Sequence, residues 1–304
     1  MNQPLRPMRL GELLDRAIQL LRTNLGLFFG IALPPAIAQF AMSTAGDFFR
    51  ADGRGIGYAI SGLTVIVLLL GNLIITPVAT AAQCWATSQL SLSRAATVRS
   101  AYGSFSNRKA SLVGLAIMQG LMSFWPVVIL YFVATALLSA LHSKGGVAFA
   151  VIIVALCAIP CGLVWARYLL AFPATAILRT PAGPSIDRSV TLGDGYRWKV
   201  MWAGLLPLGI LWALKGSGDW LIGLLNAWGP FARHSDFLAP FLVNFWNLLV
   251  DLVFMPLEFI ALTLVYYDLC VRKEGLDIAL MMEQAGMETI AEPAALTSAG
   301  EEPA

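Results

Sequence analysis

Long apolar runs and short amphipathic segments alternate along this chain. Before the first apolar run, apolar residues recur every three or four positions with charged residues between them, which predicts an amphipathic helix at a membrane surface. The apolar positions of this helix are Leu10, Leu13, Leu14, Ala17, Ile18 and Leu21. Two further segments of this kind, residues 93–106 and 184–194, also precede apolar runs. In the first of these two, Ser93 is the residue that we expect to cap the helix.

The apolar runs are long enough to cross a bilayer. No charged residue lies between Arg54 and Arg94. The same holds between Lys109 and Lys144, and each gap exceeds the ~20 residues that span the hydrocarbon core. The other predicted spans are Leu25–Met42, Val147 to about Leu178, Val200 to about Trp228, which Lys215 and Asp219 interrupt, and Leu238–Tyr267. The pattern therefore predicts an all-α, polytopic membrane protein with six transmembrane helices.

Near-copies in the sequence indicate an internal repeat. Asp15–Leu20 and Asp187–Leu192 match closely, and Val98–Tyr102 is a weaker third copy. The predicted unit is an amphipathic helix followed by a membrane hairpin, used three times. The three units cover residues of about 8–90, 93–180 and 184–273, and their second spans carry Pro77, Pro173 and Pro256 at parallel positions. We expect one membrane domain over residues 1–287 and a disordered acidic tail over residues 288–304.

Composition and charge placement agree with this assignment and orient the chain. Hydrophobic residues make up 58% of the 304 residues and charged residues only 12%, about half of what a soluble domain carries. With the N-terminus inside, fourteen of the twenty basic residues fall in inner segments and five in outer loops. Cytoplasmic loops retain Lys and Arg, so both termini are predicted to be cytoplasmic. We expect the inner face to meet anionic lipid head groups, and the scattered charges argue against nucleic acid.

Polar residues in the last predicted span are the best candidates for a site. Asn244, Asn247, Asp251 and Glu258 share one helix face. Acids at membrane depth usually face a bundle interior or a wet cavity. Arg167, in the fourth span, is the candidate counter-ion of Glu258. The alternative interpretation is a polar seam that holds the last helix against its neighbours.

Other catalytic or cofactor chemistry is not indicated. His142 and His234 fall in predicted outer loops without neighbouring ligands, so we expect no metal site and no other cofactor. Cys157 and Cys161 lie one helical turn apart, a spacing that rarely suits a disulfide, and all four cysteines are interpreted as apolar fillers. The spans contain no Ser–His, paired-Asp or His–Glu arrangement. The chain is therefore not expected to be an enzyme.

Three segments carry a family resemblance. They are Met8–Ala17, Asp187–Gly193 and Leu264–Asp277, the last being the most specific. Together they resemble bacterial membrane proteins of the glycerophosphoryl diester phosphodiesterase membrane domain family, over roughly residues 5 to 285. In that family the phosphodiesterase is a separate barrel domain carried by some members, and this chain has no room for one. The resemblance implies a multi-span membrane module without an assigned activity.

Two functions fit these observations. The first is a non-catalytic lipid-interacting or scaffold module of the cytoplasmic membrane, for which the sequence identifies no particular protein partner. The second is a small-solute or ion transporter or channel that uses Asp251 and Glu258. A permeation path needs polar groups on several spans, and outside the last span these are sparse: Gln39, Asn72, Gln83, Gln119 and Arg167. The sequence therefore favours the first function.

Overall fold

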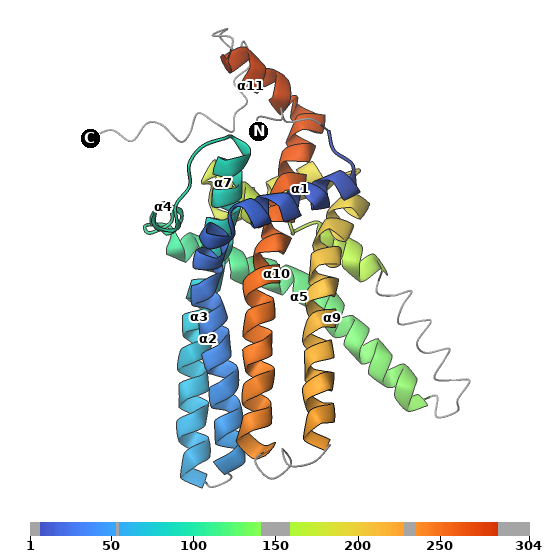
Figure 1. Cartoon of the computed structure of the whole chain (residues 1–304). Coiled ribbons are helices and arrows are strands. Elements are labelled where there is room, and N and C mark those ends of the chain that lie inside the picture. The colour runs from blue at the N-terminus through green and yellow to red at the C-terminus, as the bar shows by residue number, and fades with distance from the viewer. Residues whose placement is uncertain (1–6, 53–54, 141–158, 228–234, 285–304) are drawn as a thin grey trace. The chain divides into compact units, whose positions relative to one another are not determined.

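The computed structural model describes residues 7–52, 55–140, 159–227 and 235–284. Within these ranges the chain is helical and contains no strand (Figure 1). The helices are α1 (Leu10–Thr23), α2 (Leu25–Asp52), α3 (Gly55–Ser91), α4 (Val98–Gly103), α5 (Lys109–Ala140), α7 (Ala171–Leu178), α8 (Ala182–Gly193), α9 (Arg197–Ala227), α10 (Ser235–Glu274) and α11 (Leu276–Gln284). Residues 159–166 are also helical. His142, His234, Cys157 and the tail 288–304, on which predictions were made, lie outside the described residues.

Among the described residues, five helical segments are long and apolar enough to cross a membrane. They are Leu25–Asp47, Ile66–Ser91, Ile159–Leu178, Arg197–Leu224 and Leu238–Glu274. The apolar stretch Lys109–Met122 at the start of α5 is shorter than a span. The structure thus confirms a helical chain with several helices that are apolar enough to span a membrane. The sixth span and the threefold repeat stay predictions.

The chain forms two compact units. Unit 1 draws on residues 1–13, 110–204 and 262–304, and unit 2 on residues 14–109 and 205–261. Helices α1, α5, α9 and α10 each contribute residues to both units. Each unit is described by itself below.

The amphipathic helix predicted at the start of the chain is confirmed. Helix α1 buries Leu13, Ala17 and Leu21, which are at most 6% exposed, on the apolar face that the spacing predicts. Its charged face includes Asp15 and Arg22. The backbone N–H of Arg9 donates to Glu12 Oε2 at 3.1 Å, which satisfies one of the free donors at the helix start.

In unit 2, α2 and α3 pack side by side, and α4 contacts both (Figure 1). Pro35 lies inside α2 and has no N–H, so the carbonyl of Ile31 loses its helical donor. The Tyr102 hydroxyl of α4 donates to that carbonyl at 2.7 Å. A Cβ on Gly30 would lie 2.7 Å from a Val98 methyl, so glycine lets α4 approach α2 closely. Helix α4 therefore packs against α2 where Pro35 leaves a backbone carbonyl without its helical hydrogen bond.

The start of α4 differs from the expectation for Ser93. The N-cap is Thr97, whose hydroxyl accepts from the Ser100 N–H at 3.2 Å, while Ser100 Oγ accepts from the Thr97 N–H at 3.0 Å. Ser93 instead ends the previous helix: its φ is +58°, and the Arg94 N–H donates to the Gln89 carbonyl at 2.8 Å. Two serines and a threonine near one boundary all satisfy the cap preference, and the turn after α3 selects the later one.

In unit 1, the segment around Arg167 interrupts a helical candidate span. Residues 167–170 form a turn between the helix 159–166 and α7. The Ala171 N–H donates to Tyr168 instead of Arg167, and the Arg167 carbonyl accepts from Ser189 Oγ of α8 at 2.7 Å. Helices α7 and α8 pack together around a small core of Leu115, Ala171 and Ile186. Helix α8 ends at Gly193, and Gly195 has a φ of +81°, a backbone conformation that glycine adopts readily.

Candidate functional site

The polar stripe of the last predicted span lies on α10, and its members have different surroundings. Asn244, Asp251 and Glu258 are seven residues apart, so successive members lie about 10 Å apart along the helix. In unit 2, Asn244 is 7% exposed, and its Nδ2 donates to Asp47 Oδ2 of α2 at 3.0 Å. The first member of the stripe therefore joins α10 to α2.

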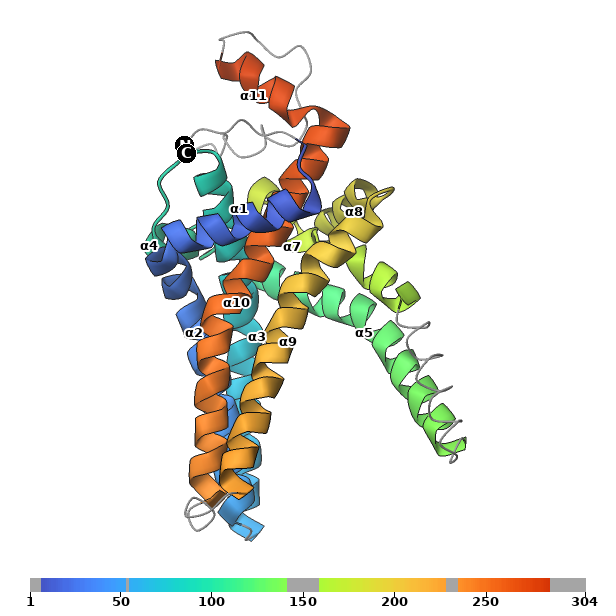
Figure 2. The same ribbon diagram turned by 45° about the vertical axis from the view of Figure 1, so that its right-hand side comes forward.

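Asp251 forms an ion pair across unit 2. Its Oδ1 lies 2.7 Å from Lys215 Nζ of α9, and both side chains are largely buried, with exposed fractions of 15% and 23%. The Trp246 indole N–H donates to the Leu214 carbonyl at 2.9 Å, beside the same pair (α9 and α10, Figure 2). Sequence reasoning noted Lys215 only as an interruption of the fifth span. The signal that was missed is a single basic residue, Lys215, in one apolar run and an acid, Asp251, near the middle of the next predicted span.

The side chains of the remaining candidates have no polar partner among the described residues. The Asn247 Oδ1 atom is buried without a hydrogen bond there, and so is the Arg167 Nε atom. Glu258 is partly buried and has no ion pair or hydrogen bond within the described part of the chain. Glu258 belongs to unit 2 and Arg167 to unit 1, so their pairing stays a prediction. The structure thus joins Asn244 and Asp251 to other helices of unit 2.

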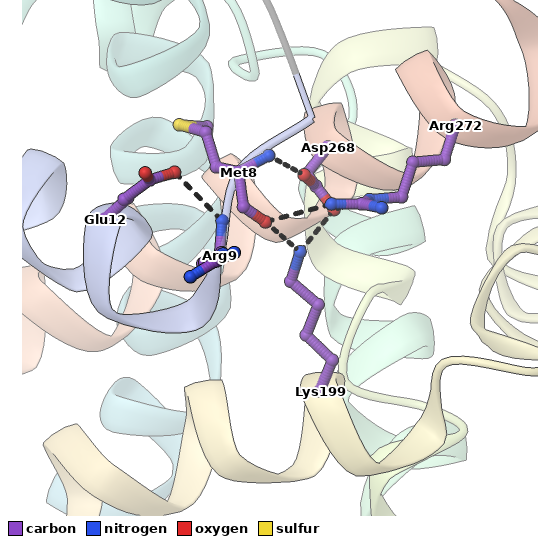
Figure 3. Close-up of polar contacts among 6 residues, drawn as sticks. All are labelled: Met8, Arg9, Glu12, Lys199, Asp268 and Arg272. Atoms are coloured by element: carbon purple, nitrogen blue, oxygen red, sulfur yellow. Dashed lines mark hydrogen bonds and ion pairs between the residues drawn. The ribbon is translucent and has the colours of Figure 1, made fainter.

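A second polar cluster, which sequence reasoning did not single out, centres on Asp268 in unit 1 (Figure 3). The Asp268 side chain has no exposed surface. Its Oδ1 accepts from the Met8 backbone N–H at 2.6 Å. Its Oδ2 accepts from Lys199 Nζ at 2.6 Å and from Arg272 Nε at 2.9 Å. One buried carboxylate therefore holds the start of the chain, the start of α9 and the end of α10.

Local helical geometry explains how these groups meet. Arg272 follows Asp268 by four residues, which places both on the same face of α10. Lys199 lies in the first turn of α9. Lys199 and Arg272 also donate to the Met8 carbonyl, at 2.6 and 3.1 Å. Both backbone groups of Met8 are thereby satisfied. We name Met8, Lys199, Asp268 and Arg272 the clasp.

The same end of α10 also holds α8. Arg188 Nη2 lies 2.7 Å from Glu274 Oε2, and its Nε donates to the Tyr266 hydroxyl at 3.5 Å. Burial lowers the pKa of the Arg188 guanidinium, but hydrogen bonds and attraction to Tyr266 and Glu274 outweigh burial and raise that pKa above its ordinary value. Lys273 Nζ donates to the Thr191 carbonyl at 2.8 Å.

Residues from each of the three segments that carry the family resemblance thus come together in unit 1. The opening segment contributes Met8, the middle segment Arg188 and Thr191, and the closing segment Asp268 and its neighbours. Sequence reasoning missed the role of Asp268 because its partners are up to 260 residues away. The available signal was an acid in an apolar stretch, four residues before an arginine.

A metal site does not emerge within the described residues, where no three His, Cys, Asp or Glu side chains gather. Cys84, Cys161 and Cys270 form no disulfide within the described part of the chain. Comparisons of the chain with protein-family models, curated proteins and solved structures returned no match. The resemblance to the glycerophosphoryl diester phosphodiesterase membrane domain family stays a prediction.

Proposed function

We propose that this chain is a non-catalytic module of the cytoplasmic membrane that interacts with lipids or serves as a scaffold. In this proposal it has six spans and both termini in the cytoplasm, as the distribution of basic residues predicts. The observation that carries the proposal is the clasp, in which the most buried acid of the described residues is fully used to hold the chain together.

The chemistry of the clasp supports a structural role. A catalytic carboxylate needs a free oxygen that faces the substrate. Both oxygens of Asp268 are occupied, by a backbone N–H and by two cationic side chains, and the side chain is fully buried. A fully buried group in these surroundings stabilises an arrangement of helices. The resemblance of three segments to a multi-span membrane module agrees with this proposal.

Lipid-dependent stability tests the proposal. The purified protein in a neutral detergent should unfold at a higher temperature when phosphatidylglycerol is added than when phosphatidylcholine is added, because bound lipid stabilises the native state. Hydrolysis of glycerophosphocholine should not exceed that of a detergent blank, with or without Mg²⁺ or Ca²⁺. Turnover that is lost on Asp251→Asn or Glu258→Gln would instead identify an intramembrane enzyme. If the two lipids raise the unfolding temperature equally, the protein has no preference for anionic lipid.

A transporter or channel is the second candidate, and one observation favours it. Polar contacts in unit 2 connect four helices: Asn72 to Gln39 at 3.2 Å between α3 and α2, Asn244 to Asp47 between α10 and α2, and Lys215 to Asp251 between α9 and α10. Polar groups on several helices are what a permeation path requires.

Flux measurements separate the two candidates. Proteoliposomes loaded with a pH-sensitive dye should show proton flux that Asp251→Asn abolishes if the second candidate is correct. Asp219→Asn is a matched control, because Asp219 is an exposed acid on the same helix as Lys215. Under the first proposal, neither variant differs from empty liposomes.

A further inference from the structure

We propose that residues 92–109 of unit 2 form the surface that binds anionic lipid head groups. The inference rests on the proposed lipid-interacting function and locates it in one segment. This segment contains α4 and the residues on either side of it, between the end of α3 and the start of α5.

The segment carries positive charge that nothing nearby in the sequence cancels. No Asp or Glu occurs between Asp52 and Asp187. Within that stretch, four exposed basic residues lie in the segment: Arg94, Arg99, Arg108 and Lys109. Arg94, Arg99 and Lys109 form no ion pair with any of the described residues. The segment therefore has cationic side chains that are available to an external anion.

Four basic residues of unit 1 differ in this respect. Lys199 and Arg272 both contact Asp268, Arg188 contacts Glu274, and Arg197 lies 2.8 Å from Asp194. These four cations are paired within the protein. An anionic head group gains less from a cation whose charge is already compensated. Arg94, Arg99 and Lys109 of unit 2 therefore attract an anion more strongly than these four paired cations do.

Packing fixes the orientation of the segment. Ala101 and Phe105 are at most 1% exposed, and the Tyr102 hydroxyl is bound to the Ile31 carbonyl. The apolar side of α4 is thus occupied by protein. Arg94 and Arg99 lie on the exposed side.

The neighbours of the segment identify a lipid as its partner. The candidate span Ile66–Ser91 ends immediately before the segment, and the apolar stretch Lys109–Met122 begins at its end. The basic residues therefore lie within a few residues of helices that are apolar enough to enter a bilayer, at the level where lipid phosphates are found. Basic residues next to a membrane span attract anionic lipids with ~1 kcal/mol each.

Native mass spectrometry of the full chain in neutral detergent can test this surface. The protein is titrated with phosphatidylglycerol and, separately, with phosphatidylcholine. The test variant is Arg94→Gln/Arg99→Gln. The matched control, Arg197→Gln/Lys273→Gln, removes the same charge from exposed positions of unit 1. Because ~1 kcal/mol corresponds to about a fivefold change in affinity, we expect the test variant to bind phosphatidylglycerol about 25-fold more weakly. We expect less than a threefold change in the control.

A charge-conserving variant and two other anions complete the test. Arg94→Lys/Arg99→Lys should bind phosphatidylglycerol as the unaltered chain does, and an unchanged unfolding temperature shows that each variant is folded. Equal losses in the test and control variants, or a loss of equal size for phosphatidylcholine, would overturn the assignment to residues 92–109. So would tighter binding of inorganic phosphate or a single-stranded oligonucleotide than of phosphatidylglycerol. If the unaltered chain shows no preference for phosphatidylglycerol, the lipid-interacting function itself fails.

Discussion

Asp251 and Asp268 are two acids of one helix with different surroundings. Asp268, in unit 1, has no exposed side-chain surface and accepts from Met8, Lys199 and Arg272. Asp251, in unit 2, is 15% exposed and has one ion pair, with Lys215. Removing a single contact leaves Asp268 paired, whereas Asp251 depends on a single lysine. The comparison indicates that the clasp is structural, while the Asp251 pair has no second cation that would compensate for the loss of Lys215.

The largest expected effect is that of Asp268→Ala. It leaves Lys199 and Arg272 without their carboxylate and the Met8 N–H without an acceptor, and breaking a buried pair costs about 3–5 kcal/mol. The free energy of unfolding in mixed micelles measures this loss. Asp268→Asn, which keeps the size of the side chain, should lose most of the same stability. A loss below about 1 kcal/mol would show that the clasp contributes little.

The Lys215–Asp251 pair should show a smaller effect that depends on the partner. Lys215→Met leaves Asp251 largely buried without its cation, and we expect a loss of about 1–3 kcal/mol. Lys215→Met/Asp251→Asn should lose less than the sum of the two single variants, since neither charge is then unpaired. Additive losses in the same unfolding assay would mean that the pair has no net coupling.

The stabilisation of unit 2 by the Tyr102 hydroxyl should depend on Pro35. Tyr102→Phe leaves the Ile31 carbonyl without a donor and should cost about 1–2 kcal/mol. Pro35→Ala restores an N–H in α2, so Tyr102→Phe should cost less in that background. If Tyr102→Phe costs the same with Pro35 and with Ala at that position, the stabilisation by the hydroxyl does not depend on the proline.

Alkaline pH provides a second check of the same hydroxyl. Burial raises the pKa of Tyr102 to about 12, because the phenolate is disfavoured away from water. The folded state then holds a proton that the unfolded state releases near pH 10. The contribution of Tyr102 should be complete below pH 10 and decline between pH 10 and 12. The difference between the unaltered chain and Tyr102→Phe, measured against pH, isolates this contribution from other titrating groups.

The smallest effect is expected at the Arg197–Asp194 pair. The two side chains are 38% and 67% exposed, and exposed pairs contribute about 0–1 kcal/mol. Arg197→Gln should therefore change the unfolding free energy by less than about 1 kcal/mol, and added salt should reduce the change further. A loss comparable to that of Asp268→Ala would contradict the distinction between buried and exposed pairs.

Periodicity predicted the helices but not the contacts between them. The burial of Leu13, Ala17 and Leu21 follows from their helical spacing, which is a local property of the sequence. The end of α8 at Gly193, two residues before Gly195 with its positive φ, follows equally from local backbone preference. An apolar run does not determine which face of its helix packs against which other helix. The pairing of Lys215 with Asp251 could therefore not be deduced from the sequence. The contact of Met8 with Asp268 joins opposite ends of the chain, and its residue types alone do not indicate it.

The clasp assigns Asp268 the role of fastening Met8, just before α1, to the end of α10. Amide hydrogen exchange of a peptide covering residues 7–13, in the intact protein, tests this role most directly. The peptide should exchange slowly in the unaltered chain and at least a hundredfold faster in Asp268→Ala, given a loss of about 3 kcal/mol or more. The control Asp194→Ala, at an exposed pair, should leave its exchange unchanged. Equal protection of this peptide in the unaltered chain and in Asp268→Ala would contradict the account.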